Sequence, residues 1–316
     1  MQKRYAAIDL GSNSCRLTIA DNNGKIIFKN NFATKLGEGL FASGKLSPDS
    51  FVRAENAFTS FRSELDKYEV SSNCVRAIAT AACRMASNSG DLQTLIKEKT
   101  GINLEIIDEK EEAELNLIGG MKHVLDKSKY VVLYDLGGAS TEITLATNSK
   151  NPQIIYTISI PWGARNATEA FEIDNKRIEN HQKLQKEINA YVVDFVEKSK
   201  LKKYDDIAFV ATSSTPLRLV ALLNEEEHYN RDEADGKIID CAKTDVLIEK
   251  QLARSTEDMV KDERIGENRA PIFAAACIIF QTIYRGLGAR KITASLASAQ
   301  DGIIQQFMER DNGKTD

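Results

Sequence analysis

Asp135-Leu136-Gly137-Gly138-Ala139-Ser140-Thr141-Glu142 is the stretch from which the fold of this chain can be inferred. The apolar residues 130–134 precede it, so the pattern is that of a buried strand that ends in an acid and a glycine turn. Glycines let the backbone approach a ligand closely, and successive N–H groups in such a turn form a concavity that binds anions. The aspartate at the strand end can hold a cation that in turn holds a phosphate. The stretch therefore predicts a loop that binds phosphate and metal.

The same pattern occurs a second time near the start of the chain. Residues 9–20 and 135–146 carry the same amino acid at six of twelve positions. The offset of 126 residues is the size of a domain rather than of a short repeat. We expect two domains that each open with a strand, a phosphate turn and a strand, and that face one another across a cleft. Two unrelated hairpins with glycine turns are the alternative, which the match between the stretches disfavours.

Length and composition restrict the class of protein. A chain of 316 residues, 42% apolar and 28% charged, suits one large or two ordinary soluble domains. A net charge of −4, with no long block of one sign, argues against nucleic-acid and membrane-surface partners. The five cysteines are scattered, which indicates reduced thiols and a cytoplasmic protein. No apolar run approaches the ~20 residues of a spanning helix, and no signal peptide precedes the first strand.

The patterns predict alternating strands and helices, with the second domain starting near Lys129. In the first domain we expect strands at 5–10, 15–21, 25–32, 73–79 and 103–107 and helices at 47–68, 80–86 and 91–100. A further helix should begin at Asp108, which forms a capping-box-like pattern with Glu111, and continue to about Leu125. In the second domain we expect strands at 130–134, 141–147, 153–160, 206–211 and 290–294, helices at 168–171, 175–199, 244–254 and 269–287, a further helix that starts at 212–216, and an exposed loop at 225–240. A closing helix follows at 299–310.

Several kinds of chemistry lack support in the sequence. The three histidines are far apart, and there is no Walker-type lysine loop, no GxGxxG after a strand and no GxSxG elbow. Two phosphate loops and the acidic helix start at 108–114 remain, which suit attack of water on phosphorus with Mg²⁺ neutralising the phosphate oxygens. Two plainer readings stay open. Glu112 can be a favourable charge at a helix start, and residues 212–216 can be a simple helix cap rather than a phosphate site.

Six motifs in order along the chain carry a family resemblance. They are Asp9–Ser14 with Arg16-Leu17, Ala77–Arg84, Glu111-Glu112-Ala113, Asp135–Glu142, Ile160–Arg165 and Asn268-Arg269-Ala270. With these motifs the chain resembles the exopolyphosphatase/guanosine-pentaphosphate phosphohydrolase (Ppx/GppA) family of the actin-like ATPase superfamily. The resemblance implies an α/β fold of two ribonuclease H-like (actin-like ATPase) domains facing across a cleft. It places domain I at 1–125, with the closing helix at 299–316 packing back on it, and domain II at 126–298.

The resemblance also implies a set of site residues. Glu112 would be the catalytic base that activates water, and Asp135 and Glu142 would hold Mg²⁺. Phosphates would be bound by Gly11, Ser12, Asn13, Ser14, Arg16, Arg84, Gly137, Gly138, Ser140 and Arg269. We further expect Glu112 to face the cleft while Glu109 and Glu114 point away from it, because neighbouring positions on a helix diverge.

The implied activity is hydrolysis of a phosphoric anhydride bond. The substrate would be inorganic polyphosphate, or alternatively the 5′-phosphate of guanosine pentaphosphate, with a non-catalytic sensor of these ligands as a third reading. Departures from the family pattern at Ala139, Glu114, Ser214 and Gln300 bear on that choice, since Ser214 stands where the family has a flexible glycine and Ala139 replaces a loop glycine. The oligomeric state, including a homodimer, is left open.

Overall fold

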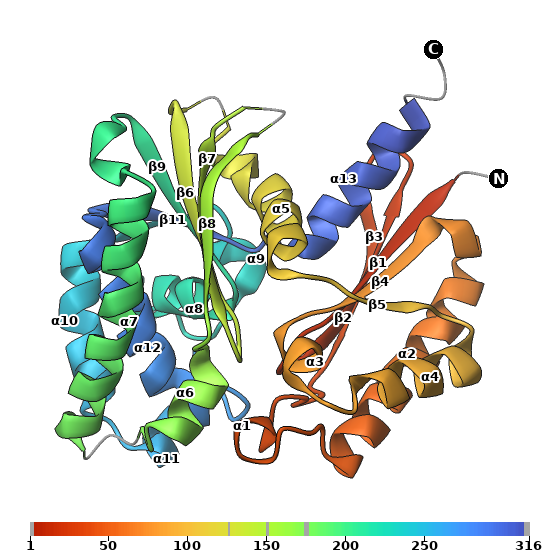
Figure 1. Cartoon of the computed structure of the whole chain (residues 1–316), viewed down its shortest axis with the longest axis horizontal. Coiled ribbons are helices and arrows are strands. Elements are labelled where there is room, and N and C mark those ends of the chain that lie inside the picture. The colour runs from red at the N-terminus through yellow and green to blue at the C-terminus, as the bar shows by residue number, and fades with distance from the viewer. Residues whose placement is uncertain (1–2, 126, 150–151, 174–176, 313–316) are drawn as a thin grey trace. The chain divides into compact units, whose positions relative to one another are not determined.

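The computed structural model describes residues 3–125, 127–149, 152–173 and 177–312. The chain divides into two compact units, the first made of Met1–Gly119 and Ala299–Asp316 and the second of Gly120–Ser298. The division falls within helix α5 (Glu109–Gly120) rather than after residue 125. Each unit is described by itself, with the labels of Figure 1.

The first unit is built on a five-stranded sheet in the order β3-β2-β1-β4-β5. An antiparallel meander of β1 (Arg4–Leu10), β2 (Cys15–Asp21) and β3 (Ile26–Phe32) is extended by β4 (Val75–Ala79) and β5 (Leu104–Ile106), which run parallel to β1. Its helices are α1 (Leu40–Ser43), α2 (Pro48–Lys67), α3 (Ala81–Met85), α4 (Ser89–Thr100), α5 (Glu109–Gly120) and α13 (Ala299–Asn312), with a 3₁₀ turn at Ser72–Cys74. Ser47 caps the start of α2, because its side chain accepts from Ser50 N.

The second unit repeats this plan and adds one strand, in the order β10-β11-β9-β6-β7-β8. β6 (Tyr130–Leu136), β7 (Thr141–Thr147) and β8 (Ile154–Ile160) form the meander, and β9 (Ile207–Thr212) and β11 (Lys291–Ser295) continue parallel to β6. β10 (Ile238–Asp240) closes the edge antiparallel to β11. The helices are α6 (Ala164–Ala170), α7 (Ile178–Lys198), α8 (Ser214–Leu223), α9 (Arg231–Ala234), α10 (Cys241–Leu252), α11 (Thr256–Lys261) and α12 (Ala270–Leu287). Two 3₁₀ turns span Met121–His123 and Leu201–Lys203.

The duplication inferred from the sequence extends to details of the backbone. Asp9 lies opposite Arg16 in the first hairpin, and Asp135 lies opposite Glu142 at the same register in the second. The register between the second and third strands shifts at Ile19/Ala20 in one unit and at the equivalent Leu145/Ala146 in the other. Because a bulge is a specific feature of a strand pair, its recurrence at matching positions confirms that the two hairpins are copies of one structural unit.

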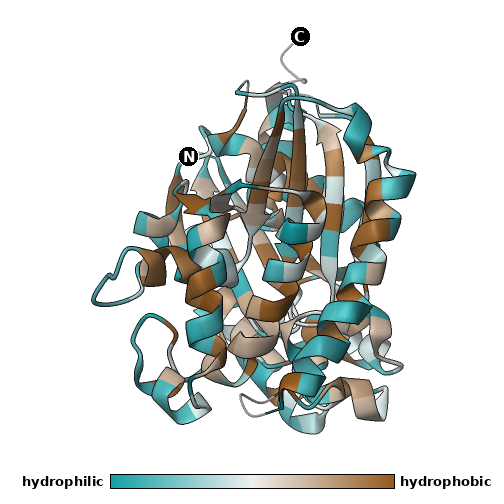
Figure 2. Ribbon diagram, turned by 90° about the vertical axis from the view of Figure 1, so that its left-hand side faces the viewer, coloured by the Kyte–Doolittle hydropathy of each residue, from teal (hydrophilic) through white to brown (hydrophobic). Residues whose placement is uncertain are grey.

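Each unit has its own hydrophobic core. In the first, the closing helix α13 lies beside β1 (Figure 1) and contributes Ile303, Ile304 and Phe307 to the core, where Phe307 stacks on Tyr5 at 5.5 Å between ring centroids. In the second, α12 packs against α7 and α6. Figure 2 shows hydrophobic residues along the strands and alternating hydrophobic and polar residues along the helices. This is the pattern of helices that bury one face against a sheet.

Helix α12 is, among the described residues, the one helix that is long and apolar enough to cross a membrane by length and composition. No such segment was expected, because no apolar run in the sequence approaches ~20 residues. In the structure 78% of this helix is buried, and its side chains form the centre of the second core. Burial against α7 and α6 accounts for its apolar composition.

Several predicted boundaries were wrong. The helix that was expected to reach Leu125 ends at Gly120, and a 3₁₀ turn follows it. The segment 225–240, expected to be an exposed loop, contains α9 and the edge strand β10. The helix α11 was not predicted, and the expected start of α7 at Asn175 lies outside the described residues. These elements are short, and β10 exists through pairing with a strand more than fifty residues away, which local patterns do not record.

Candidate active site

The loop between β6 and β7 is the tight turn that the sequence predicted. Gly137 N donates to Ser140 O at 3.0 Å, which closes the turn and places Gly137, Gly138 and Ser140 at the end of the hairpin. A Cβ on Gly137 would stand 3.0 Å from Ser140 O, so the turn leaves little room for a side chain there. The loop therefore presents backbone rather than side chains to whatever it binds.

Two carboxylates face each other at the mouth of this hairpin. Asp135 and Glu142 are cross-strand partners, and each offers an oxygen within 4.8 Å of the other. Thr212 Oγ1 donates to Asp135 Oδ1 at 2.9 Å and Ser159 Oγ donates to Glu142 Oε1 at 3.0 Å, so neighbouring strands orient both acids. Glu142 is only 3% exposed. Like charges this close and this buried repel each other strongly, and a bound cation would relieve the repulsion.

The donor set fits a hard divalent cation. All four polar groups at this position, two carboxylates and two hydroxyls, offer oxygen, which Mg²⁺ and Ca²⁺ prefer over nitrogen or sulfur. The residues present are thus compatible with the expected Mg²⁺ but do not by themselves choose between the two ions.

The first unit forms the same turn with a different charge pattern. Gly11 N donates to Ser14 O at 3.0 Å, as in the second loop, and Ser12, Asn13 and Ser14 are at most 8% exposed. Here the residue opposite the strand-end acid is Arg16, whose Nη1 lies 3.8 Å from Asp9 Oδ2. The acid in the first hairpin is therefore balanced by an arginine of its own hairpin, whereas the second hairpin pairs acid with acid.

Glu112 lies in the first turns of α5, and Arg84 on α3 reaches it. Asp108 Oδ1 accepts from Glu111 N at 2.8 Å, which confirms the predicted cap of the helix. Arg84 Nη1 donates to Glu112 Oε2 at 2.6 Å and to Ile107 O at 3.1 Å. Glu112 is 7% exposed, so its carboxylate is buried next to a positive charge.

The expectation that Glu109 and Glu114 point away from the cleft did not anticipate that Glu109 and Glu112 contact the same arginine. Glu109 Oε1 lies 3.1 Å from Arg84 Nε, so both acids reach the same guanidinium. Helix geometry alone carries no information on a cation that another helix contributes. Glu114 does point elsewhere: its side chain is 47% exposed and lies 3.9 Å from Lys110.

The turn from β9 into α8 is strained at one residue. Ser213 has a φ of 89°, a conformation that side chains disfavour, and its Oγ is buried with no hydrogen-bond partner among the described residues. The sequence analysis placed the lost flexible glycine at Ser214, but Ser214 is already the first residue of α8. The position that would gain most from a glycine is therefore Ser213.

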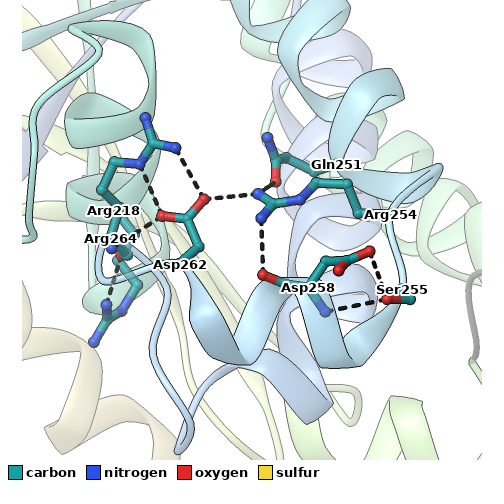
Figure 3. A network of polar contacts seen from close by, with 7 residues as sticks. All are labelled: Arg218, Gln251, Arg254, Ser255, Asp258, Asp262 and Arg264. Carbon is teal, nitrogen blue, oxygen red and sulfur yellow. Dashed lines mark hydrogen bonds and ion pairs between the residues drawn. The ribbon is translucent and has the colours of Figure 1, made fainter.

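Arg269 is the N-cap residue of α12, and a polar network fixes the segment that leads to it (Figure 3). Asp262 accepts from Arg264 Nε and Arg254 Nη1, both at 2.8 Å, and these bonds hold its pKa down at about 2. Gly266 N then donates to Asp262 O at 2.8 Å and Arg269 N donates to Gly266 O at 3.1 Å. The chain from Asp262 to Arg269 is thus held by consecutive hydrogen bonds.

The predicted site residues fall into two groups. The first unit contains Gly11, Ser12, Asn13, Ser14, Arg16, Arg84 and Glu112, and the second contains Gly137, Gly138, Ser140, Asp135, Glu142 and Arg269. Within the units, the structure brings Arg84 to Glu112 and Asp135 to Glu142. The sequence analysis missed the orienting roles of Thr212 and Ser159. Thr212 had been considered only as part of a helix cap or a phosphate site.

Both sheets have the strand order of the ribonuclease H-like fold, with a meander followed by parallel strands, and the two together give the α/β class of the actin-like ATPases. The family model described as the Ppx/GppA phosphatase family matches residues 18–311. The chain belongs to that family.

Similar proteins agree with this assignment. The bifunctional 3-dehydroquinate synthase/phosphatase of Fusobacterium nucleatum is 31% identical over 180 residues, which are 54% of this chain and 27% of that protein. Exopolyphosphatase 2 of Mycobacterium tuberculosis is 30% identical over 178 residues, 52% of this chain and 54% of that protein. The matches thus span about half or less of the length of these relatives. A solved structure of an exopolyphosphatase from Cytophaga hutchinsonii has a TM-score of 0.88 over 98% of each chain at 21% identity, which shows a shared fold.

Proposed function

We propose that this chain is a Mg²⁺-dependent phosphohydrolase that releases the terminal phosphate of inorganic polyphosphate. The observation that carries the proposal is the pair Asp135 and Glu142. Their carboxylates lie close together beside the glycine loop that joins β6 and β7. Membership of the Ppx/GppA phosphatase family supports the reaction class. Relatives named exopolyphosphatase support polyphosphate as the substrate.

The proposal gives each group of residues one task. Asp135 and Glu142 hold Mg²⁺, which when bound neutralises phosphate oxygens and orients the phosphoryl group for in-line attack. Backbone N–H groups in each loop bind phosphate oxygens, as turns of this kind do. Glu112 accepts a proton from the attacking water, whose oxygen forms a new bond to the terminal phosphorus. The bridging P–O bond breaks, and the shortened chain leaves with its oxygen negatively charged.

We propose a positioning task for Arg84 in addition to the phosphate contact expected of it. Its guanidinium is engaged by Glu112, Glu109 and Ile107 O. We assign it to holding the Glu112 carboxylate in place, since a short charge-assisted hydrogen bond from a guanidinium that is itself anchored on Ile107 O restricts the orientation of that side chain. A base held in this way needs no reorganisation when water arrives.

Guanosine pentaphosphate is the alternative substrate, and a sensor without turnover is the third reading. The test is to incubate the full chain with Mg²⁺ and either polyphosphate or guanosine pentaphosphate, and to follow phosphate release together with equilibrium binding. Release from polyphosphate at the higher kcat/KM supports the proposal, and a higher value for guanosine pentaphosphate selects the alternative. Binding of either ligand without release would overturn the hydrolase assignment in favour of the sensor.

A further inference from the structure

The carbonyl groups of Gly137, Gly138 and Ala139 in the second loop point toward the start of α6. Ala164 N donates to Gly137 O at 3.0 Å, and Arg165 N and Asn166 N donate to Gly138 O at 2.8 and 3.2 Å. The side chain of Asn166 completes the set by donating from Nδ2 to Ala139 O at 2.8 Å. Three consecutive carbonyls of the loop are therefore bound by one short segment that follows β8.

This arrangement sets the direction of the loop's N–H groups. In a trans peptide the C=O of one residue and the N–H of the next point in opposite directions, and the described residues contain no cis peptide. With the carbonyls of 137–139 turned to α6, the N–H groups of Gly138, Ala139 and Ser140 point the other way. No acceptor is recorded for these three N–H groups within the described part of the chain. Successive N–H groups aimed to one side are what an anion-binding turn requires.

Two residues of the α6 segment make the close approach possible. A Cβ on Gly163 would stand 2.5 Å from both Ala139 N and Gly138 C, distances at which the loop backbone would have to move. Asn166 is 3% exposed, and its side chain uses all its groups locally: Oδ1 accepts from Gly163 N at 2.8 Å and Nδ2 also donates to Pro161 O at 2.9 Å. The Asn166 side chain thus links the loop, at Ala139 O, to Pro161 O and Gly163 N in the segment before α6.

The first unit uses the same device with different residues. Gly37 N donates to Ser12 O at 2.8 Å and Lys35 N donates to Asn13 O at 3.0 Å, so the segment after β3 binds the carbonyls of the first loop. Lys35 adopts a φ of 46°, a left-handed conformation that most residues avoid. Because the segment after the third strand binds the equivalent carbonyls in both copies, the contact is part of the duplicated unit rather than an accident of one loop.

We propose that Gly163 and Asn166 are positioning residues for the second phosphate loop, which turn its carbonyls away so that the N–H groups of residues 138–140 are available to a phosphate. The expected effect on turnover rests on the proposed function. The expected effect on phosphate binding by the loop does not. Gly163→Ala should disturb the loop by direct collision, although it can also impair folding. Asn166→Ala is the sharper variant, because it removes the donor to Ala139 O without adding volume.

The control is Asn148→Ala in the same unit. Asn148 is also buried and its Nδ2 donates to two oxygens, Val124 O at 2.6 Å and Ser128 Oγ at 2.9 Å, but it does not touch the loop. Both substitutions should lower stability similarly, by about 1–3 kcal/mol, because each leaves buried acceptors unpaired. A difference between them in phosphate binding then reports on the loop and not on stability.

The experiment titrates the ¹⁵N-labelled full chain with inorganic phosphate in the presence of Mg²⁺, below the melting temperatures, and follows the amide signals of residues 138–140. We expect saturable shifts in the parent and in Asn148→Ala, with dissociation constants within twofold of each other. Asn166→Ala should bind phosphate at least tenfold more weakly and lose at least tenfold in kcat/KM for polyphosphate. Equal phosphate affinity in the two variants, or no shift of these amides in the parent, would overturn the inference. Loop binding in a parent that hydrolyses nothing would overturn the proposed function alone.

Discussion

Glu112 and Glu109 offer a comparison of two acids that contact one arginine. Glu112 is 2.6 Å from Arg84 and almost fully buried, whereas the side chain of Glu109 is 54% exposed. Glu112→Gln keeps the shape of the side chain but cannot accept the proton, so kcat for polyphosphate should fall by about 10²–10⁴-fold. Binding of polyphosphate should remain, because the loops that hold it are unchanged.

Glu109→Gln is the matched control for this prediction. It removes a charge from the same guanidinium at an exposed position, where an ion pair contributes little, and kcat should stay within about threefold. Steady-state kinetics and equilibrium binding on both variants test the assignment. If Glu112→Gln hydrolyses polyphosphate as fast as the parent, the carboxylate is only a charge at a helix start.

Asp135 and Asp9 occupy the same register in the two hairpins and differ in the residue opposite. Asp135 faces Glu142 and Asp9 faces Arg16, so the prediction is that only Asp135 contributes to a cation site. Asp135→Asn should weaken Mg²⁺ binding at least tenfold, because it removes one of two charged ligands. Asp9→Asn should leave the Mg²⁺ affinity within twofold. Calorimetric titration of the two variants with Mg²⁺ measures both, and equal losses would show that the charge pattern does not determine the site.

At the level of helices, α13 crosses α5 at Gly302. A Cβ on this glycine would stand 2.3 Å from Leu115 O, a backbone atom of the helix that carries Glu112. Gly302→Ala should therefore destabilise the protein by about 1–3 kcal/mol, as overpacking typically does, and should lower kcat by shifting α5. The control is Gly90→Ala in α4, which meets nothing within 4 Å and should be neutral or slightly stabilising. Thermal unfolding monitored by circular dichroism compares them, and an unchanged melting temperature for Gly302→Ala would contradict the packing argument.

The segment that connects α11 to α12 depends on one ionised carboxylate. The pKa of Asp262 is lowered from 3.8 to about 2, chiefly by the hydrogen bonds from Arg264 and then from Arg254 (Figure 3). A lowered pKa means that the folded state prefers the ionised form, so the stabilisation is present above pH 4 and is lost as the pH falls toward 2. The shift corresponds to about 2 kcal/mol.

Asp262→Asn should consequently be less stable than the parent by about that amount at pH 7, and the difference should shrink as the pH falls from 4 toward 2. Urea unfolding at pH 7, 4 and 3 measures the difference. A gap that stays constant across this range would mean that the charge of Asp262 does not contribute to stability. If Asp262→Asn also displaces Arg269, which follows in the same segment, KM for polyphosphate should change as well.

Over the whole chain, the elements that the sequence predicted well are those with a local signal. The two hairpins were recognisable because alternating apolar residues and glycine turns repeat at an offset of 126 residues. The long helices α2 and α12 carry caps and apolar faces of their own. In contrast, β10 has three residues and pairs with a strand more than fifty residues away, while α9 and α11 have four and six residues, too few for a recognisable apolar periodicity.

The site shows the same division. The acids and glycines of each loop could be predicted, because the loop is contiguous in sequence. The groups that orient them could not, since Thr212 is 77 residues from Asp135 and Asn166 is 27 residues from Ala139. The contact between Glu112 and Arg84 joins two motifs that were both noticed, yet nothing in the sequence indicated that these two side chains would contact each other.

The negative charge of the whole molecule makes binding of a polyanion depend on a bound cation. The chain carries a net charge of −4, and the proposed substrate is a polyanion that must approach Asp135 and Glu142. Two unit charges about 5 Å apart interact by about 3 kcal/mol at an effective dielectric constant of 20, so without a divalent cation the acids should repel the phosphates. A chelator such as EDTA should therefore abolish release of phosphate and weaken equilibrium binding of polyphosphate, while far-UV circular dichroism stays unchanged. Added Mg²⁺ should restore both parameters, and NaCl at the same ionic strength should not, because screening does not provide a ligand for the phosphate oxygens. Undiminished turnover in the presence of excess chelator would refute the metal dependence.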